Sequence, residues 1–231
     1  MMPADAARLR RGGRLAGALY LVVVLSGLFC LAYVPSRTGA TLLEARAQAD
    51  LFRAGIAAFL LMQVAFLLVP LALYRVLADA GREAAVLMVA LAVASVPVGL
   101  VAATHRMEAL ALVQGSAEDG TAQAAFAAAM ERYGHGLRIA SLFWGLWLLP
   151  FGMLVLRSGR LPRLLGGLLV LGGLGYVAKV FGGLVPGGLG IPMDYLTLPA
   201  ALGEIGSCLW LLAFGVRMTR PGSVPPAGSA A

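Results

Sequence analysis

Six long apolar runs, separated by short polar gaps, constrain the fold of this chain more than any other feature. They cover residues 14–34, 54–74, 84–104, 137–156, 164–184 and 198–216. About 20 apolar residues cross the hydrocarbon core of a bilayer as a helix, and unpaired backbone groups are not tolerated in lipid. The composition agrees, because 60% of the residues are apolar and only 13% are charged. We predict an all-α fold: one membrane domain, residues 14–218, built as a six-transmembrane-helix bundle.

The arginines predict the orientation of this bundle. If the N-terminus is cytoplasmic, eleven arginines lie in cytoplasmic segments and six in outer segments. This positive-inside bias predicts an N-in and C-in topology. The eleven are Arg8, Arg10, Arg11, Arg14, Arg75, Arg82, Arg157, Arg160, Arg163, Arg217 and Arg220, and the six are Arg37, Arg46, Arg53, Arg106, Arg132 and Arg138. Residues 1–13 are then a basic cytoplasmic segment, and residues 219–231, rich in Pro, Gly, Ser and Ala, a disordered cytoplasmic tail.

The net charge of +7 raises the question of nucleic-acid binding. No basic cluster interleaves with aromatic residues, as it would in a protein that binds nucleic acid. The basic balance follows from the membrane topology, and the lipid bilayer is the expected partner.

The lengths of the polar gaps predict which helices are neighbours. The connections at residues 75–83 and 157–163 are short, so the second and third spans, and the fourth and fifth, are antiparallel neighbours joined on the inner side. The longest outer gap contains the alanine-rich segment 121–134, which predicts a helix beginning near Thr121. That helix either lies at the outer interface or extends the fourth span.

The fifth span is rich in glycine. Gly166 and Gly173 lie seven residues apart, as do Gly175 and Gly182, and Ala178 and Gly182 form a small-xxx-small pair. Small residues allow helix backbones to approach closely in lipid. This face therefore serves either a homodimer or, as the alternative, the packing of a central helix inside the monomer's own bundle.

Two charged residues fall within the last two spans. Lys179 is the only lysine of the chain, and Glu204 is the only acidic residue inside the six runs. Counted from the ends of their runs, both lie roughly 7–9 Å below the outer surface. A lone charge at that depth is costly, and a pair relieves much of the cost, so we predict an ion pair between them. Alternatively, Lys179 extends toward Asp194 in the outer loop, or the pair is a structural clip without a ligand.

Other polar residues gather near the predicted outer surface. His105 and Glu108 share a helix face, as do Glu131, His135 and Arg138 if the helix continues through them. Imidazole nitrogens and carboxylate oxygens are zinc ligands, so His105, Glu108 and His135 are candidates for zinc or a similar ion. The chain lacks an HExxH motif and a cysteine ligand pair, and ordinary interfacial side chains are the alternative interpretation.

Three stretches carry a resemblance to a known family: LRRGGRLAGALYL near the start, RMEAL after the third run, and RSGRLPRLLGGLLVLGGLGY around the fifth. With its six spans, the chain resembles, over about residues 8–218, the bacterial polytopic membrane family catalogued as domain of unknown function 4386. The resemblance implies a multi-pass protein of the bacterial cytoplasmic (inner) membrane. It implies no active site and no cofactor.

The function predicted from these patterns is the non-catalytic binding of a small or lipid-like ligand in an outward-facing polar cavity. Its walls would be Lys179, Glu204, His105, Glu108 and Arg138, and Gln63, central in the second span, would either line the cavity or bond a neighbouring helix. An intramembrane enzyme with a metal or acid/base site in the same outer cluster is the alternative, and a small transporter the third.

Overall fold

The structure is a computed structural model, and it describes residues 3–116, 120–185 and 195–217. Within these residues every element is helical, which confirms the predicted all-α fold. The helices are α1 (Pro3–Gly27), the π-helix η1 (Leu28–Tyr33), α2 (Val34–Thr38), α3 (Leu42–Ala47), α4 (Ala49–Leu77), the 3-10 turn η2 (Ala78–Ala80), α5 (Arg82–Gln114), α6 (Gly120–Ser158), α7 (Arg163–Gly182), the 3-10 turn η3 (Tyr195–Thr197) and α8 (Leu198–Phe214).

Within the residues that the structure describes, six spans are long and apolar enough to cross a membrane. They cover residues 7–38, 49–80, 82–114, 120–158, 163–182 and 195–214. Several are longer than the apolar runs because polar residues continue the helices at their ends. The alanine-rich segment 121–134 is the first part of α6, so it extends the fourth span. Part of the basic N-terminal segment is also helical, because α1 begins at Pro3; the tail 219–231 lies outside the described residues.

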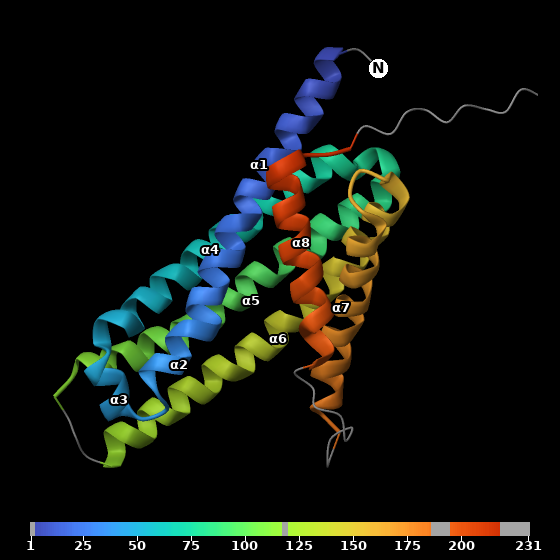
Figure 1. Cartoon of the computed structure of the whole chain (residues 1–231). Helices are drawn as coiled ribbons and strands as arrows, with labels where there is room; N and C mark the ends of the chain where they lie inside the picture. Colours follow the sequence, from blue (N-terminus) through green and yellow to red (C-terminus); the bar gives the residue numbers. More distant parts are fainter. Residues whose placement is uncertain (1–2, 117–119, 186–194, 218–231) are drawn as a thin grey trace, which may run out of the picture.

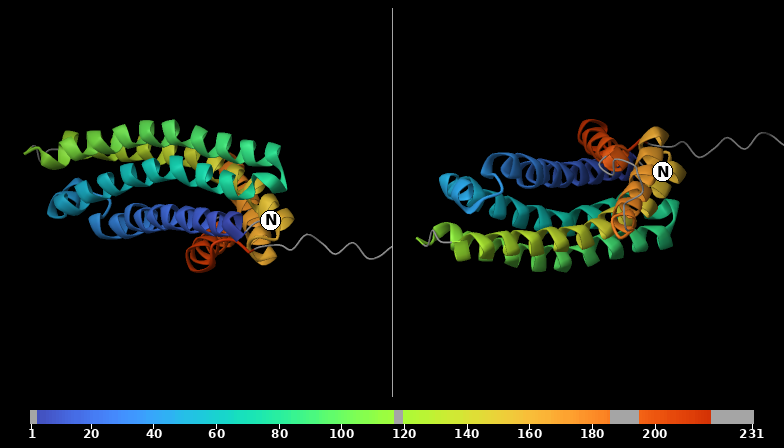
Figure 2. Two further views of the ribbon diagram at one scale, coloured as in Figure 1. Left: turned by 90° about the horizontal axis from the view of Figure 1, so that it is seen from above. Right: turned by 90° about the horizontal axis from the view of Figure 1, so that it is seen from below.

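The spans pack in a closed ring. Each contacts the next along the chain, and α1 contacts both α4 and α8. Figure 1 shows α7 and α8 running at a steep angle to α1, α4, α5 and α6. In both views of Figure 2, α4 lies between α1 and the pair formed by α5 and α6, with α7 at one end of this stack. The predicted antiparallel neighbours, α4 with α5 and α6 with α7, are thus in contact.

The two short connections lie at one end of the bundle, as expected. The guanidinium of Arg160, between α6 and α7, donates to a carboxylate oxygen of Asp79 in η2 at 2.9 Å. The chain after α8 reaches the same end, since the amide of Arg217 donates to the carbonyl of Arg160 at 2.9 Å. Which side of the membrane this end faces remains a prediction from the arginine bias.

Glycines bring α1 and α8 close together near this end. A Cβ on Gly17 would lie 2.6 Å from the backbone nitrogen of Leu212, so the crossing requires glycine. Figure 1 shows the two helices diverging beyond the crossing, away from the N-terminal end of α1. This divergence leaves room between them in the other half of the bundle.

The glycines of α7 face its neighbours in the same chain. Gly166 and Gly173 lie against the backbone of α6, and Gly172 and Gly175 lie against Ala200 and Leu196 at the start of the last span. This is the packing of a helix within its own bundle, the alternative stated for the glycine face. A homodimer through α7 stays a prediction.

Candidate functional site

A cavity of about 220 Å³ lies where α1 and α8 diverge. Its walls come from α1 with η1, α4, α6, α7 and α8, so five of the six spans contribute to it. Four side chains bring a hydroxyl, amide or carboxyl group to it: Tyr20 from α1, Gln63 from α4, Tyr176 from α7 and Glu204 from α8. The remaining lining residues are apolar or aromatic. Gln63 and Glu204, both predicted as site residues, therefore lie together in one cavity.

The hydroxyl of Tyr20 donates a hydrogen bond to Oε1 of Glu204, with 2.8 Å between the two oxygens. Tyr20 itself is fully buried. The bond holds one carboxylate oxygen of Glu204 in place and leaves the acceptor capacity of the other oxygen to the cavity. The contact joins α1 to α8 beyond the glycine crossing at Gly17.

Gln63 is also fully buried, and its two amide atoms differ in their partners. The nitrogen Nε2 donates to the carbonyl of Val96 at 3.3 Å, whereas Oε1 has no partner among the described residues. The carbonyl of Val96 can only accept, so this contact fixes which way the amide is turned. Gly99 makes room for the amide, because any side chain there would collide with it. An unpaired buried acceptor beside a cavity can accept a hydrogen bond from a donor group of a ligand.

Aromatic rings form much of the remaining wall. Trp147 is fully buried, with Phe66 edge-on to it at 5.1 Å between ring centroids and Tyr20 tilted against it at 6.1 Å. Trp144 and Tyr176 line the cavity as well and are only partly buried. The cavity thus combines one carboxyl group with a largely aromatic surround.

The cavity opens sideways between α1 and α8. Leu28, Ala201 and Ile205 line it and are at the same time exposed on the outside of the bundle. In a membrane, that outside surface faces lipid. The opening therefore leads from the cavity into the bilayer rather than into an aqueous loop region.

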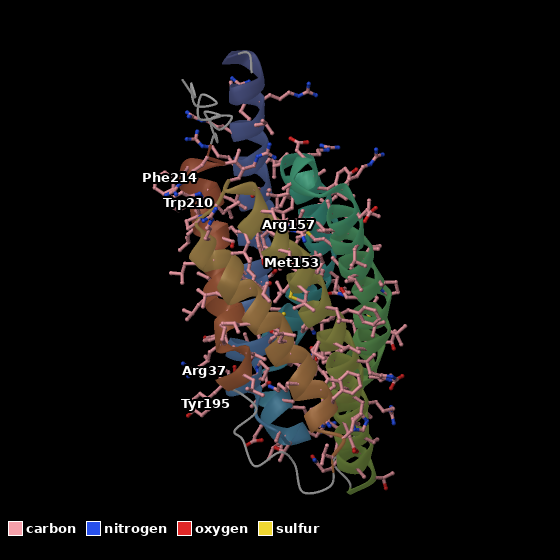
Figure 3. All side chains as sticks on the ribbon, turned by 90° about the vertical axis from the view of Figure 1, so that its right-hand side faces the viewer. Arg37, Met153, Arg157, Tyr195, Trp210 and Phe214 are labelled. Atoms are coloured by element: carbon pink, nitrogen blue, oxygen red, sulfur yellow. The ribbon has the colours of Figure 1, made fainter. Side chains whose placement is uncertain are left out.

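Glu204 lies near the middle of its span, deeper than the sequence estimate of 7–9 Å. The last span begins at Tyr195 and ends at Phe214, and Figure 3 shows these two residues at opposite ends of the bundle. Glu204 is nine residues from the first and ten from the second. At 1.5 Å per residue it lies roughly 14–15 Å from either end. The estimate was too shallow because the η3 turn continues the span beyond Leu198.

Lys179 lies at a different level from Glu204. Gly203, next to Glu204, packs against the backbone of Leu169 on α7. Lys179 follows Leu169 by ten residues, or about 15 Å of helix, and lies half-buried in the last turn of α7. The hydroxyl of Tyr20 bonds Glu204 within the described residues, and the ion pair between Lys179 and Glu204 stays a prediction.

The outer cluster forms on α5 and α6, apart from the cavity. Nδ1 of His105 lies 3.3 Å from Oε2 of Glu108, and the guanidinium of Arg132 lies 3.1 Å from the same oxygen. Nε2 of His135 lies 3.9 Å from Glu131 instead.

Arg138 is exposed on α6. Neither Arg138 nor any other predicted residue of this outer cluster lines the cavity. No three His, Cys, Asp or Glu side chains come together within the described residues, and the zinc site stays a prediction.

The family model for domain of unknown function 4386 (DUF4386) matches residues 15–215. The chain belongs to this family. Neither the curated proteins nor the solved structures contain a match. Membership in DUF4386, together with the six apolar spans, establishes a multi-pass membrane protein and assigns no activity.

Two polar residues of this DUF4386 protein escaped the sequence analysis. Tyr20 looked like one more aromatic residue in an apolar run, and only the fold brings it to Glu204. Arg106 was counted among the outer arginines, yet α5 continues to Gln114 and the side chain is only 2% exposed. Arg106 is the first residue of RMEAL, one of the stretches that carry the family resemblance, and that was the available signal.

Proposed function

We propose that this protein binds a small amphipathic, lipid-like molecule that enters the cavity sideways from the bilayer. The observation that carries the proposal is one cavity that joins buried hydrogen-bonding groups to an opening lined by lipid-facing side chains. A ligand with a polar head and an apolar tail matches both parts, since the head meets Glu204 and Gln63 and the tail passes Leu28 and Ile205. Because Glu204 lies near the middle of its span, we propose a cavity open to lipid in place of the predicted outward-facing polar cavity.

The size of the cavity is consistent with partial enclosure of such a ligand. Pockets that enclose a drug-sized molecule usually measure about 300–1,000 Å³. A volume of about 220 Å³ holds a head group and the first few carbons of a chain. The rest of the tail would stay among lipid chains. We place the protein in the bacterial cytoplasmic membrane, on the family resemblance and the arginine bias.

Tryptophan fluorescence offers a direct test, because two of the three tryptophans line the cavity. Trp144 and Trp147 lie at the site, and Trp210 lies elsewhere on α8, under the guanidinium of Arg217 at 4.4 Å. In a Trp210→Phe background, the probe is a single-chain alcohol brominated close to its hydroxyl, titrated into protein in a neutral detergent. Bromine quenches tryptophan on contact, so we expect quenching that saturates.

A matched pair of variants separates the cavity from the outer surface. Ala201→Phe narrows the opening and is expected to raise the half-saturating concentration about ten-fold. Leu202→Phe changes the next residue of α8, which is 62% exposed and does not line the cavity, and is expected to leave the titration unchanged. Quenching that never saturates, or that responds equally to both variants, would contradict the proposal.

A further inference from the structure

We propose that the head group recognised in this cavity is a protonated alkylamine, with Glu204 as its counter-ion. This deepens, and rests on, the proposed binding of an amphipathic molecule. It makes a commitment about charge and donor groups that the proposed function leaves open. The inference is built on three properties of the lining: its charge, its rings and its unpaired acceptors.

The first property is the charge of the lining. Glu204 is its one ionisable carboxyl group, and no lysine, arginine or histidine is among the described residues that line the cavity. Its hydrogen-bond partner there is the neutral hydroxyl of Tyr20. A carboxylate at the centre of a span carries a large free-energy cost unless a positive charge accompanies it. A cationic head group supplies that charge from the ligand.

The second property is the aromatic surround. Five rings line the cavity: Tyr20, Phe66, Trp144, Trp147 and Tyr176. Ring faces attract organic cations through their quadrupole, and tryptophan does so most strongly. Rings also pack against the carbons of an alkyl chain, whereas they provide no ligands for an inorganic ion. Calcium takes six to eight oxygen ligands, far more than Glu204, Tyr20 and Gln63 provide.

The third property is the number of acceptors without donors. Oε1 of Gln63 is buried and unpaired, and the second carboxylate oxygen of Glu204 accepts no hydrogen bond from the described residues. A ligand that satisfies both must bring N–H or O–H donors. A primary ammonium brings three such donors and the positive charge together. A quaternary ammonium brings the charge without donors, and an alcohol brings a donor without charge.

The test compares three brominated probes of equal chain length in the Trp210→Phe background: a primary amine, a trimethylammonium and an alcohol. Neutral detergent excludes attraction to a charged surface, and at pH 7 a simple alkylamine is protonated, as lysine is. We expect the amine to half-saturate quenching at a concentration about ten-fold below the alcohol, because charge-assisted hydrogen bonds are about twice as strong as neutral ones. The trimethylammonium probe is expected between the two.

The decisive variant is Glu204→Gln, which keeps the size of the side chain and an oxygen that accepts from Tyr20. It should bring the amine to the affinity of the alcohol and leave the alcohol unchanged. Glu108→Gln removes an exposed carboxylate that does not line the cavity, and should keep the full preference for the amine. Cooperative thermal unfolding of each variant shows whether it is folded before binding is compared.

The outcomes separate the two proposals. If the amine and the alcohol saturate at equal concentrations in the parent, the ammonium assignment is overturned while the lipid-facing cavity stands. A preference for the amine that survives Glu204→Gln also overturns the assignment. Trimethylammonium binding as tight as that of the amine overturns the role of N–H donors at Gln63. If no probe saturates, the proposed function fails together with the inference.

Discussion

Arg106 and Glu204 are both charged residues inside membrane spans, and their surroundings differ sharply. Arg106 is enclosed on every side. Its guanidinium approaches the carbonyl of Cys30 at 3.4 Å and the hydroxyl of Tyr133 at 3.3 Å, and lies over the rings of Phe52 and Tyr133 at 5.1 and 5.2 Å. No acidic side chain pairs with it among the described residues. Glu204 also lacks an oppositely charged partner there, but it borders open volume.

The local fold explains how Arg106 is accommodated. Cys30 lies in the π-helix η1, where the wider turn alters the backbone hydrogen-bond pattern, and its carbonyl is the one that Arg106 reaches. Gly55 on α4 leaves space for the guanidinium, since a Cβ there would lie 3.1 Å from it. The protein itself supplies the carbonyl, the hydroxyl and the ring faces that stabilise this cation.

The difference teaches which buried charge is available for function. A charged group whose partners all come from the protein has no remaining capacity to bond a ligand, and its contacts hold helices together. A charge that borders a cavity, with unpaired acceptors nearby, still has capacity for a ligand. On this comparison Arg106 is a structural residue that joins η1, α4, α5 and α6, and Glu204 is the charged residue of the proposed binding site.

The largest effect is expected from replacing the enclosed cation. Arg106→Met fills a similar volume but removes both hydrogen bonds and both ring contacts, leaving the carbonyl of Cys30 and the hydroxyl of Tyr133 without their donor. Hydrogen bonds to charged groups contribute about 1.5–3 kcal/mol and desolvated cation–π contacts about 2, offset by the relief of burying a charge. We expect a net loss of about 2–4 kcal/mol, measured as a lower midpoint of thermal unfolding in detergent.

The matched control is Arg138→Met, which removes an exposed arginine from α6 and should change the stability by less than about 0.5 kcal/mol. Binding of the amine probe should survive in Arg106→Met at temperatures where the protein is folded. Equal losses in the two variants would show that Arg106 is no more structural than a surface arginine.

A smaller effect is expected from replacing two glycines by alanine, one beside Arg106 and one in the wall of the cavity. Gly55→Ala places a Cβ 2.9 Å from Val34 and 3.1 Å from Arg106, in a region with no room to adjust, so we expect a loss of about 1–3 kcal/mol. Gly27 lines the cavity, and a Cβ added there would have the flexible side chain of Met62 as its nearest neighbour, at 3.3 Å. That variant should stay within about 1 kcal/mol of the parent, or gain stability. Thermal unfolding of the pair measures how tightly each region is packed, and a reversed order would contradict the comparison.

The fold was largely predictable from the sequence, because membrane spans depend on local composition. The six apolar runs, their antiparallel order and the helical segment 121–134 all follow from residue type and spacing. Helix ends were less predictable, since charged residues such as Arg106 continue a helix beyond its apolar run. That error placed Arg106 in an outer loop segment.

The candidate site was only partly predictable, because it depends on which helices meet. Glu204 and Gln63 stand out as polar residues within apolar runs, and both line the cavity. The depth of Glu204 was harder to predict, because the η3 turn lengthens the last span and places Glu204 near its middle; the ion pair with Lys179 stays a prediction. Tyr20 carries no local signal, since its role arises from the crossing of α1 and α8, spans distant in the sequence.

The smallest effect is expected from removing the hydroxyl of Tyr20, the hydrogen-bond donor to Glu204. Tyr20→Phe removes the donor to Glu204 and leaves the ring in place, so the cavity keeps its shape while one carboxylate oxygen loses its partner. The loss of stability should be about 1 kcal/mol, typical of one hydrogen bond. The freed carboxylate is no longer held toward the ligand, and binding of the amine probe should weaken about three-fold, measured by the same quenching titration.

Tyr176→Phe is the matched control, because this tyrosine lines the same cavity and its hydroxyl makes no hydrogen bond within the described residues. In a Glu204→Gln background, Tyr20→Phe should have no effect on the amine, since the hydroxyl acts only through the carboxylate. An equal effect in both backgrounds would show that Tyr20 contacts the ligand directly and would contradict its role as a group that acts through Glu204.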